Sequence, residues 1–144
     1  MAGIDIFLAA LLEALLCDVK IHFEKVLPNA GESFHCRRFE EPTFPAPYHT
    51  HPEIELTYIV SSHGRRFVGD SIEQFGPGDL VLIGSNLPHR WASDTPPPKA
   101  GRRWATSLVV QFLPDCLGAH FWNQPEFAAI ATLLARAQAG LVFP

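Results

Sequence analysis

The chain has 144 residues, of which 47% are hydrophobic, and its formal net charge at pH 7 is -4. This length supports one domain with its own hydrophobic core and is too short for two. The eleven Lys and Arg residues are scattered or in isolated pairs, so the segment is a poor candidate for binding nucleic acid by itself.

Residues 1–18 open the chain with an apolar run, MAGIDIFLAALLEALLC. No positive charge precedes the run, Asp5 and Glu13 interrupt it, and it is shorter than the roughly 20 residues that a membrane-spanning helix needs. We therefore expect neither a signal peptide nor a membrane anchor. Helical spacing puts one set of apolar side chains on a common face: Ile4, Leu8, Leu11, Leu12 and Leu15. This segment is either an amphipathic helix that packs on the domain or a partner, or an extension that precedes the true domain.

The three cysteines indicate the cellular compartment. Cys17, Cys36 and Cys116 are an odd number at wide spacings, and the sequence has no C-x-x-C pair. This usage argues against a disulfide framework and against a zinc knuckle. It predicts a protein of the reducing cytoplasm.

Residues 19–114 alternate short extended runs with turn residues, which predicts a barrel or sandwich of about eight strands. We expect these strands at residues 20–26, 33–40, 53–60, 65–68, 71–75, 79–83, 89–93 and 105–112. Gly69 and Asp70 signal a two-residue hairpin, and Pro77 and Gly78 suit the central positions of a type II turn. Residues 93–103 are rich in proline and glycine and are expected to form an exposed loop.

Residues 115–144 are predicted to form one helix that ends near Gly140. Asn123 and Glu126 have the spacing of a capping box, and Pro125 lies in the first turn. Apolar residues that step by three and four form a narrow seam along this helix: Phe127, Ile130, Leu134, Ala137 and Leu141. A single amphipathic helix usually lies on the outer face of its own domain. A barrel already has a core, however, so we predict that this seam forms a homodimer interface.

A cluster of histidines and carboxylates is the strongest functional signal. His49, His51, Glu53 and Glu55 occupy alternate positions as the chain enters a strand, so extended geometry points all four the same way. His89 follows a distant buried-looking strand and would meet them if the two strands lie side by side. Imidazole nitrogen and carboxylate oxygen are ligands for Zn, Ni, Fe and Mn. The alternative is that these side chains hydrogen-bond to one another without an ion.

These residues resemble the two motifs of the cupin family. His-x-His followed by Glu, the first motif, is matched by His49, His51 and Glu55, and the second motif runs from Gly78 to His89. The resemblance implies a mainly β fold, a jelly-roll barrel or double-stranded β-helix, followed here by the C-terminal helix. It implies His49, His51, Glu55 and His89 as ligands of a divalent metal ion.

The turn positions of these motifs differ from the family pattern. Gly84 stands where proline is usual and Asn86 where glycine is usual, while Thr43 and Ser62 replace the outer glycines of the first motif. These residues shape the turns that hold the ligands. The sequence therefore leaves open whether a metal ion is bound and which one.

The text from His51 to Trp91 is similar, more specifically, to the sensory domain of AraC-type transcription regulators, and the likeness extends over residues 19–141. It implies a small-molecule effector inside the barrel, such as a sugar or an aromatic or organic acid, and a trailing helix used for dimerisation. DNA would be bound by a separate helix-turn-helix part, of which this chain shows no pattern. We therefore expect a sensor, from a longer regulator or standing alone, rather than an enzyme. The alternative is a metal-dependent cupin enzyme, such as a dioxygenase, isomerase or lyase.

Five further side chains are candidates for contacting the effector: Arg38, Glu53, Trp91, Trp104 and Phe112. Arg38 ends a strand that should approach the mouth of the barrel, where it would pair with an anionic ligand or with a neighbouring carboxylate. Trp91, Trp104 and Phe112 offer flat apolar walls for a ring, or are ordinary core residues. Glu53 lies on the surface instead if Pro52 interrupts the alternation.

Overall fold

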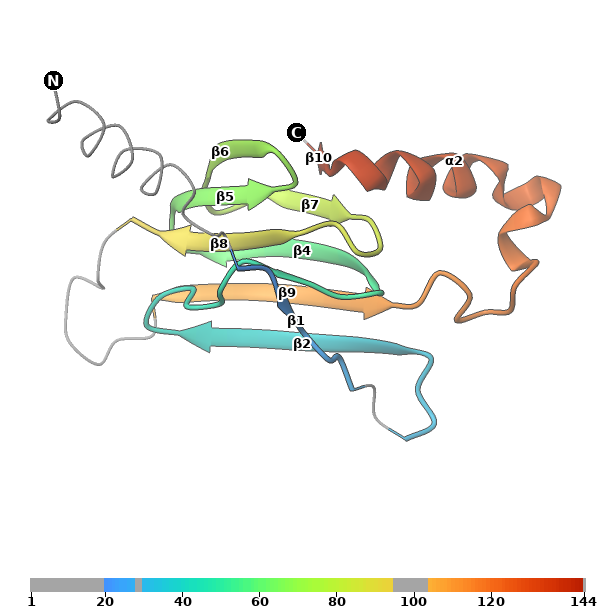
Figure 1. Ribbon diagram of the computed structural model, residues 1–144, viewed down its shortest axis with the longest axis horizontal. Helices are drawn as coiled ribbons and strands as arrows, with labels where there is room; N and C mark the ends of the chain where they lie inside the picture. Colours follow the sequence, from blue (N-terminus) through green and yellow to red (C-terminus); the bar gives the residue numbers. More distant parts are fainter. Residues whose placement is uncertain (1–19, 28–29, 95–103, 144) are drawn as a thin grey trace, which may run out of the picture.

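The computed structural model describes residues 20–27, 30–94 and 104–143 (Figure 1). The expected helix over residues 1–18 and most of the expected loop over residues 93–103 lie outside this range. The strands in the described part are β1 (His22–Phe23), β2 (Phe34–Glu41), β3 (His49–Thr50), β4 (Ile54–Ser61), β5 (Gly64–Val68), β6 (Ser71–Phe75), β7 (Leu80–Ile83), β8 (His89–Ser93), β9 (Ala105–Phe112) and β10 (Leu141–Phe143). The helical segments there are η1 (Phe121–Asn123), η2 (Pro125–Phe127), α2 (Ala128–Arg136) and η3 (Ala137–Ala139).

The strands form two sheets of five, in the orders β1-β3-β8-β5-β6 and β10-β7-β4-β9-β2 (Figure 1). All pairs are antiparallel except β1 with β3. The eight predicted strands are present, and β3 and β10 were not predicted. A strand as short as β3 gives no periodic signal, and β10 lies where the sequence predicted the end of a helix.

Both predicted turns are confirmed. Val68 pairs with Ser71 across the β5–β6 hairpin, and Gly69 has a φ of +57°. In the turn before β7, Gly78 has a φ of +98°, the left-handed conformation that a type II turn needs at this position. The Asp79 amide then closes the turn by donating to the Gly76 carbonyl oxygen at 3.2 Å.

The main core lies between the two sheets, and strand alternation decides which side chains enter it. Along β4, Glu55, Thr57 and Ile59 are buried, whereas Tyr58 and Val60 are exposed. The buried hydrophobic cluster comprises Ile59, Val68, Phe75, Val81, Ile83 and Trp91. The polar residues Glu55 and Thr57 therefore continue the inward face of an otherwise apolar strand, and this places them inside the barrel.

The C-terminal segment is less regular than the predicted single helix. The N-cap of η2 is Gln124, which makes no side-chain capping hydrogen bond, so the predicted capping box does not form. Part of the predicted seam packs inside the chain: Leu134 and Ala137 contact the cluster of Ile54 and Leu82 on the outer face of the second sheet. Ile130 stays 42% exposed. A homodimer through the remaining exposed face of the helix stays a prediction.

None of the helices in the described ranges is both long and apolar enough to cross a membrane.

Candidate metal centre and ligand cavity

Three histidine rings meet inside the barrel. His49 on β3 lies directly opposite His89 on β8 in an antiparallel pair, and His51 follows β3. The ring centroids are 4.3 Å apart for His49 and His89 and 5.0 Å apart for His51 and His89. All three residues are buried, and one potential ligand nitrogen from each lies within 4.8 Å of the others. These three residues are called the histidine cluster below.

Main-chain carbonyls orient all three rings in the same way. Each Nδ1–H donates to a carbonyl oxygen two residues away, which leaves Nε2 as the nitrogen that can bind a metal ion once it carries no proton. The bonds join His49 to Pro47 (2.8 Å), His51 to Glu53 (3.1 Å) and His89 to Leu87 (2.8 Å). Within the described part of the chain, the buried Nε2 of His89 has no hydrogen-bond partner. Fixed ring orientations and a buried Nε2 that makes no hydrogen bond fit a divalent metal ion.

Glu55 brings a negative charge to the same place. Its Oε2 lies 3.1 Å from His51 Nε2 and 3.6 Å from His89 Nε2. The carboxylate also accepts hydrogen bonds from Thr57 Oγ1 (2.6 Å) and Gln111 Nε2 (2.9 Å). Burial by itself raises the pKa of Glu55, but pairing with His51 and His89 outweighs burial and holds the pKa well below its ordinary value of 4.5. Glu55 is therefore ionised and can share the charge of a cation held by the histidine cluster.

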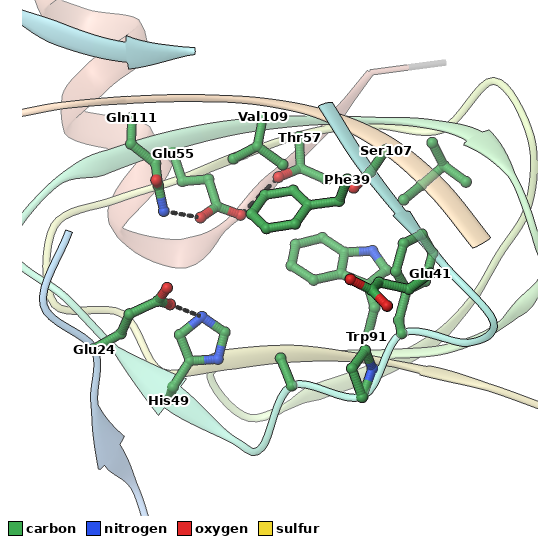
Figure 2. Close-up of a pocket in the computed structure, with 14 residues that line it drawn as sticks. Glu24, Phe39, Glu41, His49, Glu55, Thr57, Trp91, Ser107, Val109 and Gln111 are labelled. Carbon is green, nitrogen blue, oxygen red and sulfur yellow. Dashed lines mark hydrogen bonds and ion pairs between the residues drawn. The ribbon is translucent and has the colours of Figure 1, made fainter. Parts of the chain in front are cut away.

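A second carboxylate, Glu24, reaches the cluster from the end of β1. The Glu24 amide donates to the Thr50 carbonyl oxygen, which extends the parallel pairing of β1 with β3. Its Oε2 lies 3.0 Å from His49 Nε2 (Figure 2). Burial lowers the pKa of His49, but the hydrogen bonds to Glu24 and to the Pro47 carbonyl outweigh it, so the pKa lies above the ordinary 6.5. The pKa of His51 is also raised. Burial lowers this pKa, but the hydrogen bond and charge of Glu55 outweigh burial.

Metal affinity should therefore depend steeply on pH. An imidazole binds a metal ion only after it loses its proton, and raised pKa values let protons compete at higher pH than for an ordinary histidine. We expect the affinity for Zn²⁺ to fall by more than about tenfold between about pH 8 and about pH 6. Competition titrations with a chromogenic chelator across this range measure it.

The variant Glu24→Gln provides the control for this pH dependence. It removes the charge that holds the pKa of His49 high, so the loss of affinity should begin at lower pH than in the wild type. A loss that begins at the same pH in both proteins would show that Glu24 does not control the protonation of His49.

A cavity of about 230 Å³ adjoins the histidine cluster. Figure 2 shows His49, Glu24, Glu55 and Gln111 toward one end of it and Trp91 and Glu41 toward the other. The lining residues are Glu24, Phe39, Glu41, Phe44, Pro45, Ala46, His49, Glu55, Thr57, Ile59, Trp91, Ser107, Val109 and Gln111. This volume lies just below the roughly 300 Å³ at which typical small-molecule pockets begin, so the cavity suits a compact ligand, with polar groups gathered near the histidines.

The comparisons with known proteins agree with this architecture. Residues 38–99 match the model of a protein family described as "Cupin domain". The fold is a cupin barrel. This confirms the predicted fold class, a mainly β jelly roll followed by a helix.

Solved structures similar to this chain include two conserved barrel domain proteins of the cupin 2 type. The one from Salinispora arenicola CNS-205 is 15% identical, with 74% of this chain and 79% of that chain covered and a TM-score of 0.48. The one from Rhodopseudomonas palustris is 19% identical, with 72% and 74% covered and a TM-score of 0.46. ToxT from Vibrio cholerae is 12% identical, with 78% of this chain but 42% of that chain covered and a TM-score of 0.44. No curated protein matches the chain.

Two of the five predicted effector contacts lie close to the site. Trp91 is buried and lines the cavity of the cupin barrel. Glu53 is also buried, but it lies on the Nδ1 side of His51, with its Oε2 3.5 Å from that nitrogen, and does not line the cavity. The bends at Pro52 and Glu53 interrupt the extended chain, so Glu53 does not share the face of Glu55.

The structure does not bring Arg38, Trp104 or Phe112 to the cavity. On β2, alternation gives the inward position to Phe39, so Arg38 points outward and pairs with Glu40 at 2.7 Å. Phe112 packs against the helical tail on the outer face of the second sheet. Trp104 precedes β9 and makes an edge-to-face contact with a histidine to which the sequence assigned no role, His63.

Glu24, Thr57 and Gln111 belong to the site and were missed in the sequence. Thr57 and Gln111 carry a readable signal, because each is a polar residue on the inward face of an apolar strand. Glu24 carries none, since its position depends on the pairing of β1 with β3.

The departures from the cupin turn pattern have local explanations. Asn86 and Ser62 stand where the motifs have glycine, and both adopt positive φ, at +59° and +92°. Asparagine is among the residues that tolerate this conformation best, so the turn before His89 keeps its shape. At Gly84, the usual proline would lack the amide that here donates to the Ala137 carbonyl oxygen at 2.8 Å.

Proposed function

We propose that this chain is the small-molecule-sensing domain of an AraC-type transcription regulator, with the effector bound in the cavity beside the histidine cluster. The continuous resemblance from His51 to Trp91 supports this proposal, as does a cavity of suitable size. The observation that carries it is a hydrogen-bonded connection between the histidine cluster and the C-terminal segment.

That connection is the short loop between β7 and β8. At one end, the Asn86 amide donates to the carbonyl oxygen of His51 at 2.8 Å. Two residues away, the Gly84 amide donates to the carbonyl oxygen of Ala137 in η3 at 2.8 Å. A Cβ atom on Gly84 would lie 2.8 Å from the backbone of Gln138, so the loop and the tail are in close contact. A shift of His51 is therefore passed to the tail through backbone atoms.

Such a connection suits a sensor, because an effector acts by favouring one of two arrangements of the protein. In the proposed regulator, the tail would pass the change to a homodimer interface and to a DNA-binding part outside this chain, in the cytoplasm. His49, His51 and His89, with Glu55, would hold a divalent ion such as Zn, Ni, Fe or Mn. A bound ion would supply a Lewis-acidic position for an oxygen or nitrogen atom of the effector.

Hydrogen exchange tests this proposal directly. On addition of Zn²⁺ or Ni²⁺, amides of the β7–β8 loop and of residues 137–143 should exchange at least about threefold more slowly. Edge strand β2 pairs with β9 alone in the described structure and carries none of the four proposed metal ligands, so its amides serve as the internal reference. Protection confined to the histidine cluster, together with turnover of a small substrate by the metal-loaded protein, would favour the cupin enzyme instead.

A further inference from the structure

We propose that the cavity takes a ligand with an apolar body and a positively charged ammonium head, and that the head lies against Glu41. This inference rests on the proposed function in one respect, namely that a small molecule binds in the cavity. The proposed ligand differs from the sugar or the aromatic or organic acid that the sequence resemblance implied.

The charges that line the cavity are the first argument. Among the lining residues, Glu24, Glu41 and Glu55 are carboxylates, and no lysine or arginine belongs to the described lining. Glu24 is paired with His49, and Glu55 is paired with His51. The side chain of Glu41 makes no hydrogen bond or ion pair within the ranges the structure describes. Glu41 is exposed, so an anionic ligand at this end would meet a like charge, whereas a cation would gain an ion pair there.

The cavity wall is the second argument. Aromatic rings of Phe39, Phe44 and Trp91 line it, together with the aliphatic side chains of Ile59 and Val109. Aromatic faces attract an ammonium group through their quadrupole. A sugar needs hydrogen-bond partners for many hydroxyl groups, and two of the polar side chains in the wall, Thr57 and Gln111, already donate to Glu55. The wall therefore favours an apolar body.

Trp91 provides the third argument. It is 7% exposed, and its Nε1–H is buried without a hydrogen-bond partner in the described structure. Figure 2 shows the Trp91 indole and the Glu41 carboxylate toward the same end of the cavity. An ammonium head beside Glu41 would therefore also lie close to the Trp91 ring, whose face attracts a cation.

The strand register gives the separation between Glu41 and the metal-ligand candidate Glu55. Along β9, Ala105 pairs with Glu41 and Gln111 pairs with Glu55. Six residues of strand separate the backbone positions of Glu41 and Glu55 by about 20 Å, so these two carboxylates approach the cavity from opposite ends. The charge preference at Glu41 can therefore be measured on the metal-free protein.

The test uses three ligands of nearly equal size that differ in charge: 2-phenylethylamine, 2-phenylethanol and 3-phenylpropanoate. Binding is followed by NMR through the indole N–H signal of Trp91, which reports on the cavity itself. We expect the amine to bind about tenfold more tightly than the alcohol and the acid to bind most weakly. In Glu41→Gln, the affinity of the amine should fall to within about twofold of that of the alcohol.

Glu40→Gln is the matched control, because it removes the same charge one residue away on the outward face of β2, where Glu40 pairs with Arg38. It should leave the preference for the amine unchanged. The inference fails if the acid binds as well as the amine, if Glu41→Gln keeps the preference, or if none of the three ligands shifts the Trp91 signal at millimolar concentration. Each of these results leaves the sensor proposal to be decided by hydrogen exchange in the tail.

Discussion

Replacing His89 by alanine is expected to lower the affinity for a divalent metal ion by at least about 100-fold. His89 is central to the cluster, with its ring close to those of both His49 and His51, and its Nε2 makes no hydrogen bond in the described structure. Loss of a metal ligand costs more than loss of a group that merely orients one. Competition with a chromogenic chelator at about pH 8, where protons compete less with the metal ion than at about pH 6, measures the affinity.

The same substitution should affect stability less than metal binding. The ring of His89 donates one hydrogen bond, from Nδ1 to the Leu87 carbonyl oxygen, so its removal leaves mainly a small cavity that costs about 2 kcal/mol. Thermal melting of the metal-free protein checks that the variant folds. His120→Ala is the control, because His120 is exposed and lies outside the cluster. Equal affinities for all three proteins would exclude the histidine cluster as the metal site.

Replacing Gly64 by alanine is expected to lower the free energy of unfolding by about 3 kcal/mol and the melting temperature by roughly 10 °C. A Cβ atom at Gly64 would lie 2.1 Å from the carbonyl oxygen of Ala92 and 2.9 Å from the Cα of Ser93. Both atoms belong to the backbone of β8, which cannot rotate away as a side chain would. The two strands must move apart, and β8 also carries His89.

Gly76→Ala is the matched control for this stability prediction. A Cβ atom there meets nothing within 4 Å in the described structure, and Gly76 does not have a positive φ. Its effect should stay within about 0.5 kcal/mol in urea and thermal denaturation. If the Gly64→Ala and Gly76→Ala variants have the same melting temperature, β5 and β8 do not approach as closely as in the structure.

Local chemistry explains why much of the fold could be predicted. The turns at Gly69 and Gly78 depend on the backbone freedom of single glycines, and the strands between them depend on short runs of apolar residues. The spacing of His49, His51 and Glu55 is likewise a local property. These features are read from neighbouring residues, so a single sequence contains them.

The orientation of side chains on the second sheet was harder to read. The end of strand β4 is hydrophobic on both faces: Ile59 lies in the barrel core, whereas Tyr58 and Val60 stay exposed on the outer face. When both the buried and the exposed positions of a strand are hydrophobic, alternation does not reveal which face points inward. For the same reason, the sequence alone did not place Phe112 on the outer face.

By itself, the sequence determined eight of the ten strands of the described structure, the two turns, the fold class and the histidines that a metal centre would need. Only the tertiary structure decided that Glu24 reaches His49, that Gln111 and Glu55 share a hydrogen bond, and that β10 completes a sheet in place of a longer helix. Each of these contacts joins segments that are far apart in the chain. Their formation depends on strand pairing and packing across the barrel, which no local pattern encodes.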